Sequence, residues 1–147
     1  MVQLAAPIKA SLVIVHMRSG LKLEDKRKGK NIQEKRRRQA QTLRDWMLQQ
    51  NQQPVLVVGD FNSAFGDEIY QQPIEILQQP PFASAWQRLP EQERFSYIYQ
   101  CRPQAIDNIL YSDVLAERVL KVAVIRGHAG DQYRLYKKPA PSLVSDQ

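Results

Sequence analysis

An aspartate and an asparagine follow a short run of branched apolar residues, and their side chains could accept a proton, hold a cation or stabilise a developing negative charge. A strand buried on both faces is predicted by the run Val55-Leu56-Val57-Val58, which stops at Gly59. In extended backbone, alternate side chains leave the same face, so we expect Asp60 and Asn62 to point to one spot while Phe61 packs inward. A carboxylate can take a proton from water or hold a cation, and an amide can donate to an oxygen that gains charge. An Asx turn, with both side chains bonded to local backbone, is the alternative interpretation of these two residues alone.

Two further titratable side chains lie beside apolar runs. His16 is near the end of the run 8–17, which predicts a second buried strand. A histidine beside such a run is more often part of the core, but strand ends are also where open α/β sheets bind ligands. Asp107 lies in a predicted strand over 105–111, and a carboxylate among apolar neighbours requires a partner or a site. We expect that strand to form a hairpin with residues 95–99.

A basic segment and a helix separate the first two predicted strands. Asn31 and Glu34 have the spacing of a capping box, and an apolar stripe predicts a helix from there to about residue 51. The order strand, helix, strand favours a crossover between adjacent strands. The cations here that could contact nucleic acid are Arg18, Lys26, Arg27, Lys28 and Lys30. A solvated helix face explains the same charges, since no aromatic residue is interleaved to stack on bases.

The remaining segments predict little regular structure. Residues 63–94 are rich in Pro and Gln and predict a loop with a short helix near 73–78. A second short helix is expected near 113–118, and a strand at 119–126.

Length and composition favour a single domain with an anionic partner. The chain has 147 residues, is 43% hydrophobic and carries a net charge of +6, which favours nucleic acid, phosphate esters or acidic lipid headgroups. Cys101 is the single cysteine, so an intrachain disulfide and a cysteine-based metal site are excluded. We expect no transmembrane segment. Compartment and oligomeric state stay open.

Five ordered segments together resemble the endonuclease/exonuclease/phosphatase superfamily, which has the deoxyribonuclease I-like fold. They are Val15-His16-Met17-Arg18-Ser19-Gly20, Gly59-Asp60-Phe61-Asn62-Ser63, Phe95-Ser96-Tyr97-Ile98-Tyr99-Gln100, Ile106-Asp107-Asn108-Ile109-Leu110 and Ser145-Asp146. The resemblance implies an α/β (α+β) sandwich of two β-sheets flanked by helices, here partial, with residues 1–147 as the C-terminal portion of the domain. It also implies Mg²⁺, with Mn²⁺ or Ca²⁺ as substitutes, and in-line hydrolysis of a phosphodiester or phosphomonoester by activated water.

The resemblance implies a role for each matching residue. Asp60 would orient or deprotonate the attacking water, and Asn62 would stabilise charge on the phosphoryl oxygens. His16 would contact the phosphate or serve as an acid. Asp107 would be the carboxylate that orients a histidine near the family's C-terminus, and Asp146 the metal-site aspartate directly before that histidine.

The sequence departs from the family pattern at both ends. Gln147 stands where the family has that histidine, and glutamine cannot shuttle a proton. The N-terminal half of the family fold, with an Asn and the principal metal-binding Glu, has no counterpart in this sequence. We therefore expect impaired activity and an uncovered apolar sheet face, which would cause instability, self-association or pairing with a missing half. Besides a nuclease, two hypotheses stay open: a non-catalytic basic module that binds nucleic acid, and a phosphatase or lipid phosphodiesterase of the same superfamily.

Overall fold

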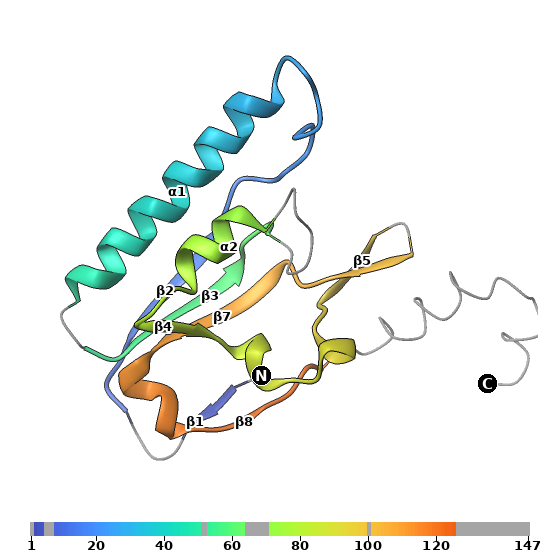
Figure 1. Cartoon of the computed structure of the whole chain (residues 1–147). Helices are drawn as coiled ribbons and strands as arrows, with labels where there is room; N and C mark the ends of the chain where they lie inside the picture. Colours follow the sequence, from blue (N-terminus) through green and yellow to red (C-terminus); the bar gives the residue numbers. More distant parts are fainter. Residues whose placement is uncertain (1, 5–7, 51–52, 64–70, 100, 126–147) are drawn as a thin grey trace, which may run out of the picture.

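A four-stranded mixed sheet forms the centre of the molecule (Figure 1). The computed structural model describes residues 2–4, 8–50, 53–63, 71–99 and 101–125. The strand order is β2-β3-β7-β4, with β2 parallel to β3 and β7 antiparallel to both of its neighbours. A long helix, α1, joins β2 to β3, so the expected crossover is present. The bounds are β2 Ser11–His16, α1 Gly29–Gln49, β3 Val55–Asp60, β4 Phe82–Ser84 and β7 Asp107–Ser112.

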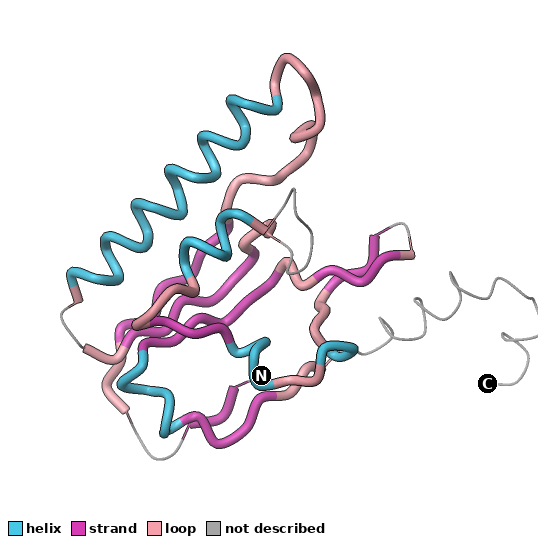
Figure 2. The backbone as a smooth tube through the Cα atoms, in the orientation of Figure 1, coloured by secondary structure: helices cyan, strands magenta, loops and turns pink. Residues whose placement is uncertain are grey.

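Both α-helices pack on one face of this sheet, called here the helix face (Figure 2). Val55 and Val57 of β3 point to this face and are at most 1% exposed. Ala40 and Met47 of α1 pack against them, together with Leu77 from α2, Gln72–Leu77. The alternation along β3 and the apolar stripe of α1 therefore build one core, in which each fully buried large side chain contributes about 1.5–3 kcal/mol.

A second, smaller sheet lies against the opposite face, called here the distal face. Its strands are β1, Val2–Leu4, and β8, Val119–Val122, which pair antiparallel. Val119 packs with Tyr111 of β7 and with Leu115 of a short 3-10 helix, η3, Asp113–Arg118. Two sheets with helices on one side agree with the expected α/β architecture. Two further 3-10 helices are η1, Ala85–Arg88, and η2, Glu91–Glu93.

The smaller sheet on the distal face does not cover β2. Leu12 is 59% exposed and Ile14 is 78% exposed, and the register places them on the same face as Leu56 and Val58. The prediction that residues 8–17 form a strand buried on both faces is therefore wrong for this face. The reason is position, since β2 is the edge strand of the described sheet while β8 lies over β7.

The predicted hairpin between residues 95–99 and 105–111 is wrong. The strand β5, Tyr97–Tyr99, pairs instead with β6, Arg102–Gln104. The chain reverses near Cys101, whose φ of +63° lies in the left-handed region. β7 is then available to pair with β3 and β4, where Ile109 packs on the distal face and Leu110 on the helix face.

The remaining boundaries differ from the expected ones by a few residues. α1 begins at Gly29 rather than Asn31, after a turn in which Asp25 Oδ1 accepts the Arg27 and Lys28 backbone N–H groups at 2.8 and 2.9 Å. These two hydrogen bonds, first that of Lys28, lower the pKa of Asp25. The expected strand at 119–126 ends at Val122, and β4 lies within a segment expected to be a loop. β4 has only three residues, which are too few for the alternation of apolar and polar side chains that predicts a strand.

Glu34 forms ion pairs along α1 in place of the predicted cap. Its carboxylate accepts hydrogen bonds from Arg37 Nε at 2.9 Å and from Arg38 Nε at 2.7 Å. These bonds, first that of Arg37, lower the pKa of Glu34 from 4.5 to about 2. Because the folded pKa is depressed, the stabilisation is fully present above pH 4.5 and is lost as the pH falls through about 2.

Replacing Glu34 with glutamine should therefore lower the thermal midpoint near neutral pH and have progressively less effect as the solution is acidified toward pH 2. The change should be small and should shrink with added salt, because all three side chains are exposed to solvent. Thermal melts of both proteins by circular dichroism across this pH window measure it. A difference between the two proteins that stayed constant through the window would contradict the prediction.

Candidate functional site

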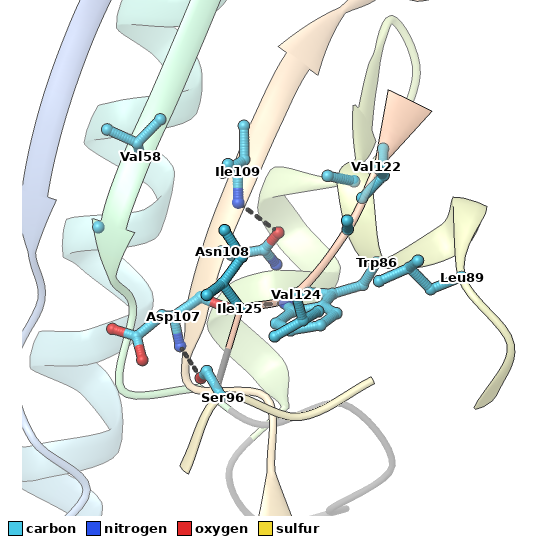
Figure 3. A pocket seen from close by; sticks show the side chains of 13 residues that line it. Val58, Trp86, Leu89, Ser96, Asp107, Asn108, Ile109, Val122, Val124 and Ile125 are labelled. Atoms are coloured by element: carbon cyan, nitrogen blue, oxygen red, sulfur yellow. Dashed lines mark hydrogen bonds between the residues drawn. The ribbon is translucent and has the colours of Figure 1, made fainter. Parts of the chain in front are cut away.

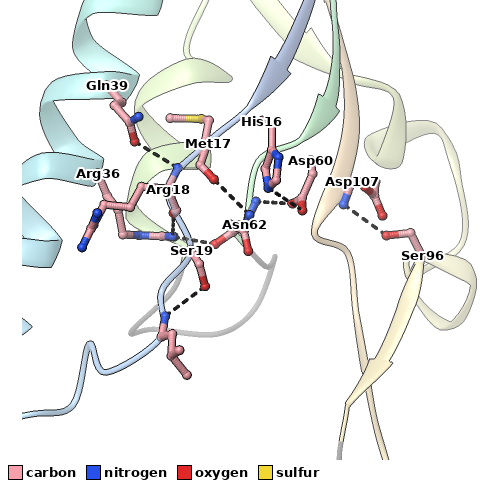
Figure 4. Close-up of polar contacts among 11 residues, drawn as sticks. His16, Met17, Arg18, Ser19, Arg36, Gln39, Asp60, Asn62, Ser96 and Asp107 are labelled. Atoms are coloured by element: carbon pink, nitrogen blue, oxygen red, sulfur yellow. Dashed lines mark hydrogen bonds and ion pairs between the residues drawn. The ribbon is translucent and has the colours of Figure 1, made fainter.

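Three strand ends bring His16, Asp60 and Asp107 into one row (Figure 4). His16 is directly opposite Asp60 in the parallel pair β2–β3, and Asp60 is directly opposite Asp107 in the antiparallel pair β3–β7. Directly opposite residues leave the same face of a sheet, so the three side chains share the distal face. His16 Nε2 lies 3.7 Å from Asp60 Oδ2. The structure thus assembles three of the four catalytic residues expected from the sequence.

The row is open to solvent. The His16 side chain is 80% exposed and that of Asp60 is 31% exposed. Asp107 is also exposed, so the expectation of a carboxylate enclosed by apolar neighbours is wrong: Asp107 is the first residue of β7 and lies at the rim of the sheet. Its backbone is nevertheless held, because its N–H donates to Ser96 Oγ at 3.1 Å and its carbonyl accepts from Trp86 Nε1 at 2.8 Å.

Asn62 does not lie in extended backbone beside Asp60. Its φ is +47°, in the left-handed region that asparagine tolerates, and its backbone N–H donates to Asp60 Oδ1 at 2.7 Å. Its side-chain Nδ2 donates to the carbonyl of Met17 at 3.0 Å. The Asx turn is therefore present, and it fixes the Asp60 carboxylate. Phe61 is fully buried, as expected.

Arg36 is a buried residue that contacts the segments after β2 and β3, and the sequence interpretation did not single it out. It is 2% exposed, and its guanidinium donates to the carbonyls of Arg18 and Asn62, each at 2.6 Å. Helical periodicity could have indicated it, because Arg36 lies four residues after Ile32 and four before Ala40 and so falls on the buried stripe of α1. In the sequence it is hidden within a run of other cations.

The five candidate phosphate-contacting cations are all exposed. Arg18 follows β2, and its backbone N–H donates to Gln39 Oε1 at 3.1 Å. The other four lie in the loop before α1 or in its first turn, at the end of the sheet where β2 and β3 end: Lys26, Arg27, Lys28 and Lys30. The expected metal ligand Asp146 and the terminal Gln147 lie outside the described residues.

An apolar pocket of about 320 Å³ opens beside the row (Figure 3). Val58, Trp86, Ile109 and Val124 line it, and Asp107 stands at its edge. The pocket lies on the distal face, between the main sheet and the segment that follows β8. It provides an apolar wall next to the two carboxylates.

The comparison with known families identifies the family of the chain. The family model described as endonuclease/exonuclease/phosphatase family matches residues 21–146. The chain belongs to this family. No curated protein and no solved structure matches it significantly. Members of the endonuclease/exonuclease/phosphatase family are hydrolases of phosphate esters that typically use divalent metal ions, and their fold is of the α/β class. None of the helices in the described residues is long and apolar enough to span a membrane.

The two facing aspartates fit such a metal ion. Like charges directly opposite each other in a sheet are destabilising, and a bound cation would relieve that repulsion between Asp60 and Asp107. In the part of the chain that the structure describes, no three His, Cys, Asp or Glu side chains, the row of His16, Asp60 and Asp107 included, are placed to hold a metal ion together. Mg²⁺ usually binds one or two protein carboxylates and completes its shell with waters and substrate phosphate, so two aspartates would be enough protein ligands for it.

Proposed function

We propose that this chain is a metal-dependent phosphodiester hydrolase that acts as a nuclease by in-line attack of activated water. The observation that carries the proposal is the solvent-open row of His16, Asp60 and Asp107 in a member of this family. A base, a second carboxylate and an imidazole on one rim are groups that can assist phosphoryl transfer to water.

Asp60 is the proposed base. The Asn62 N–H occupies Oδ1, which orients the carboxylate and presents Oδ2 to the row. Oδ2 accepts the proton of the attacking water. The Asn62 side chain uses one amide hydrogen on Met17, and its second amide hydrogen donates to a phosphoryl oxygen.

His16 and Asp107 complete the proposed site. The His16 ring, 3.7 Å from Asp60 Oδ2, contacts the substrate phosphate from the solvent side. Asp107, together with Asp60, would hold the divalent ion, and Asp146 is proposed as a further ligand on the resemblance alone. When bound, the ion stabilises charge on the phosphoryl oxygens and makes its water a stronger nucleophile at neutral pH.

Nucleic acid is the proposed substrate. Its support is the exposed set of cations at the end of the sheet where the row lies, in a chain of net charge +6. A polyanionic backbone can contact several of these cations at once, whereas a small phosphate ester cannot span them.

A substrate panel tests the proposal. The chain is assayed on duplex DNA, single-stranded RNA, bis-p-nitrophenyl phosphate and p-nitrophenyl phosphate, with Mg²⁺, Mn²⁺, Ca²⁺ or EDTA. We expect cleavage of nucleic acid and of the small diester that EDTA abolishes. Faster cleavage of the monoester would favour a phosphatase, and nucleic acid bound without cleavage would favour a binding module. Undiminished cleavage in EDTA would rule out the metal-dependent mechanism.

A triple variant in the same panel separates the substrate class from the chemistry. Changing Lys26→Gln, Arg27→Gln and Lys28→Gln should lower kcat/KM on DNA roughly tenfold at low salt and flatten the slope of log affinity against log salt by up to about 2.7. Activity on bis-p-nitrophenyl phosphate serves as the control and should not change, because that substrate is too small to reach these exposed side chains.

A further inference from the structure

The most unusual buried group in the described residues is the guanidinium of Arg36. It lies on the face of α1 that packs against the sheet, between Ile32 and Ala40, and is 2% exposed. A buried cation is costly unless hydrogen bonds replace its water. Hydrogen bonds to two backbone carbonyls offset that cost, so the side chain connects α1 to the segments that carry these carbonyls.

The guanidinium joins two segments that are far apart in the sequence. Its Nη1 donates to the Arg18 carbonyl and its Nη2 to the Asn62 carbonyl, both at 2.6 Å. Arg18 lies two residues after His16, and Asn62 lies two residues after Asp60. A planar guanidinium fixes two donors at a set separation, which a lysine ammonium cannot do.

Further hydrogen bonds connect Asn62, and Met17 next to Arg18, with Asp60 (Figure 4). Asn62 Nδ2 donates to Met17 O at 3.0 Å, and the Met17 N–H donates to Asp60 O at 2.8 Å. The Asn62 N–H then donates to Asp60 Oδ1 at 2.7 Å. An unbroken set of contacts therefore runs from α1, through the segments after β2 and β3, to the Asp60 carboxylate.

We propose that Arg36 is a positioning residue. Its guanidinium fixes the position of the segment after β2 relative to the segment after β3, so that the His16 and Asp60 side chains can both reach the same substrate phosphate. This inference rests on the proposed function. It assigns Arg36 no contact with substrate. A small displacement between a base and its partner groups is enough to slow a reaction about a hundredfold, which is the effect that loss of this guanidinium should have.

The test compares Arg36→Lys with Arg37→Lys on bis-p-nitrophenyl phosphate. Arg37 is the matched control, since it is an exposed arginine next to Arg36 that pairs with Glu34 outside the site. We expect Arg36→Lys to lower kcat about a hundredfold with KM nearly unchanged, and Arg37→Lys to behave as the parent protein. Equal kcat in Arg36→Lys and the parent, or a loss only in proportion to the unfolded fraction, would overturn the proposal.

A second variant keeps the test decisive if lysine disrupts folding. Arg36→Ala leaves a space in which added methylguanidinium can donate to the two carbonyls. Methylguanidinium should restore activity to this variant, and methylammonium, which lacks the planar pair of donors, should not. Rescue by neither compound would overturn the positioning role.

An NMR measurement separates this proposal from the proposed function. In Arg36→Lys, the amide resonances of Met17 and Asn62 should shift or broaden, while those of the last turns of α1 stay unchanged. If the parent protein cleaves no substrate, the proposed function fails, and these resonances alone decide whether Arg36 positions the two segments. Unchanged resonances would contradict it.

Discussion

Changing Asp60→Asn should reduce hydrolysis of every substrate by about three orders of magnitude, the usual contribution of a general base. The asparagine amide oxygen can still accept the Asn62 N–H that Asp60 Oδ1 accepts at 2.7 Å, so the Asx turn should persist. What the variant loses is the negative charge, and with it the proton acceptor and one ligand for a cation. Initial rates on bis-p-nitrophenyl phosphate with saturating Mg²⁺ measure the effect.

Asp45→Asn provides the matched control for this result. Asp45 is an exposed carboxylate on α1 that accepts a hydrogen bond from Gln41 Nε2 at 2.8 Å, away from the row of strand ends. It undergoes the same chemical change and should keep full activity. Full activity in Asp60→Asn, with thermal midpoints matching in all three proteins, would remove Asp60 from the mechanism.

The second large effect is expected from Gly59→Ala, which should destabilise the fold by about 3 kcal/mol or more. Gly59 has a φ of +139°, and a Cβ built there would lie 2.0 Å from the carbonyl oxygen of Val15. That atom belongs to the backbone of the paired strand β2, so neither strand can move without breaking the parallel pairing. Because Gly59 directly precedes Asp60, the same collision would also separate Asp60 from His16.

Urea denaturation measures this loss as a shift of the midpoint at unchanged slope. The control is Ser11→Ala, at an exposed position near the start of β2, which should change stability by less than about 0.5 kcal/mol. If Gly59→Ala unfolded at the same urea concentration as the parent protein, the close approach of the two strands at this point would not exist in solution.

The sequence alone determined the α/β class, the crossover from β2 through α1 to β3, and the position of Asp60 at a strand end. These features follow from local patterns: the branched apolar run at residues 55–58 and the helical stripe that includes Ala40 and Met47. The ordered motifs also identified the family before any geometry was known. His16 and Asp107 were singled out because each is a titratable residue beside an apolar run, and their roles stay predictions.

The tertiary structure decided which strands pair and which side chains meet. The sequence favoured a hairpin of residues 95–99 with 105–111, but β7 pairs with β3, and only this pairing places Asp107 opposite Asp60. Exposure of Ile14 follows from where the second sheet ends, and the left-handed backbone of Asn62 accompanies contacts with Met17 and Arg36. Local periodicity shows which face of an element is apolar. It does not show which strand pairs with which, or which carbonyls the Arg36 guanidinium contacts, because both depend on residues far apart in the chain.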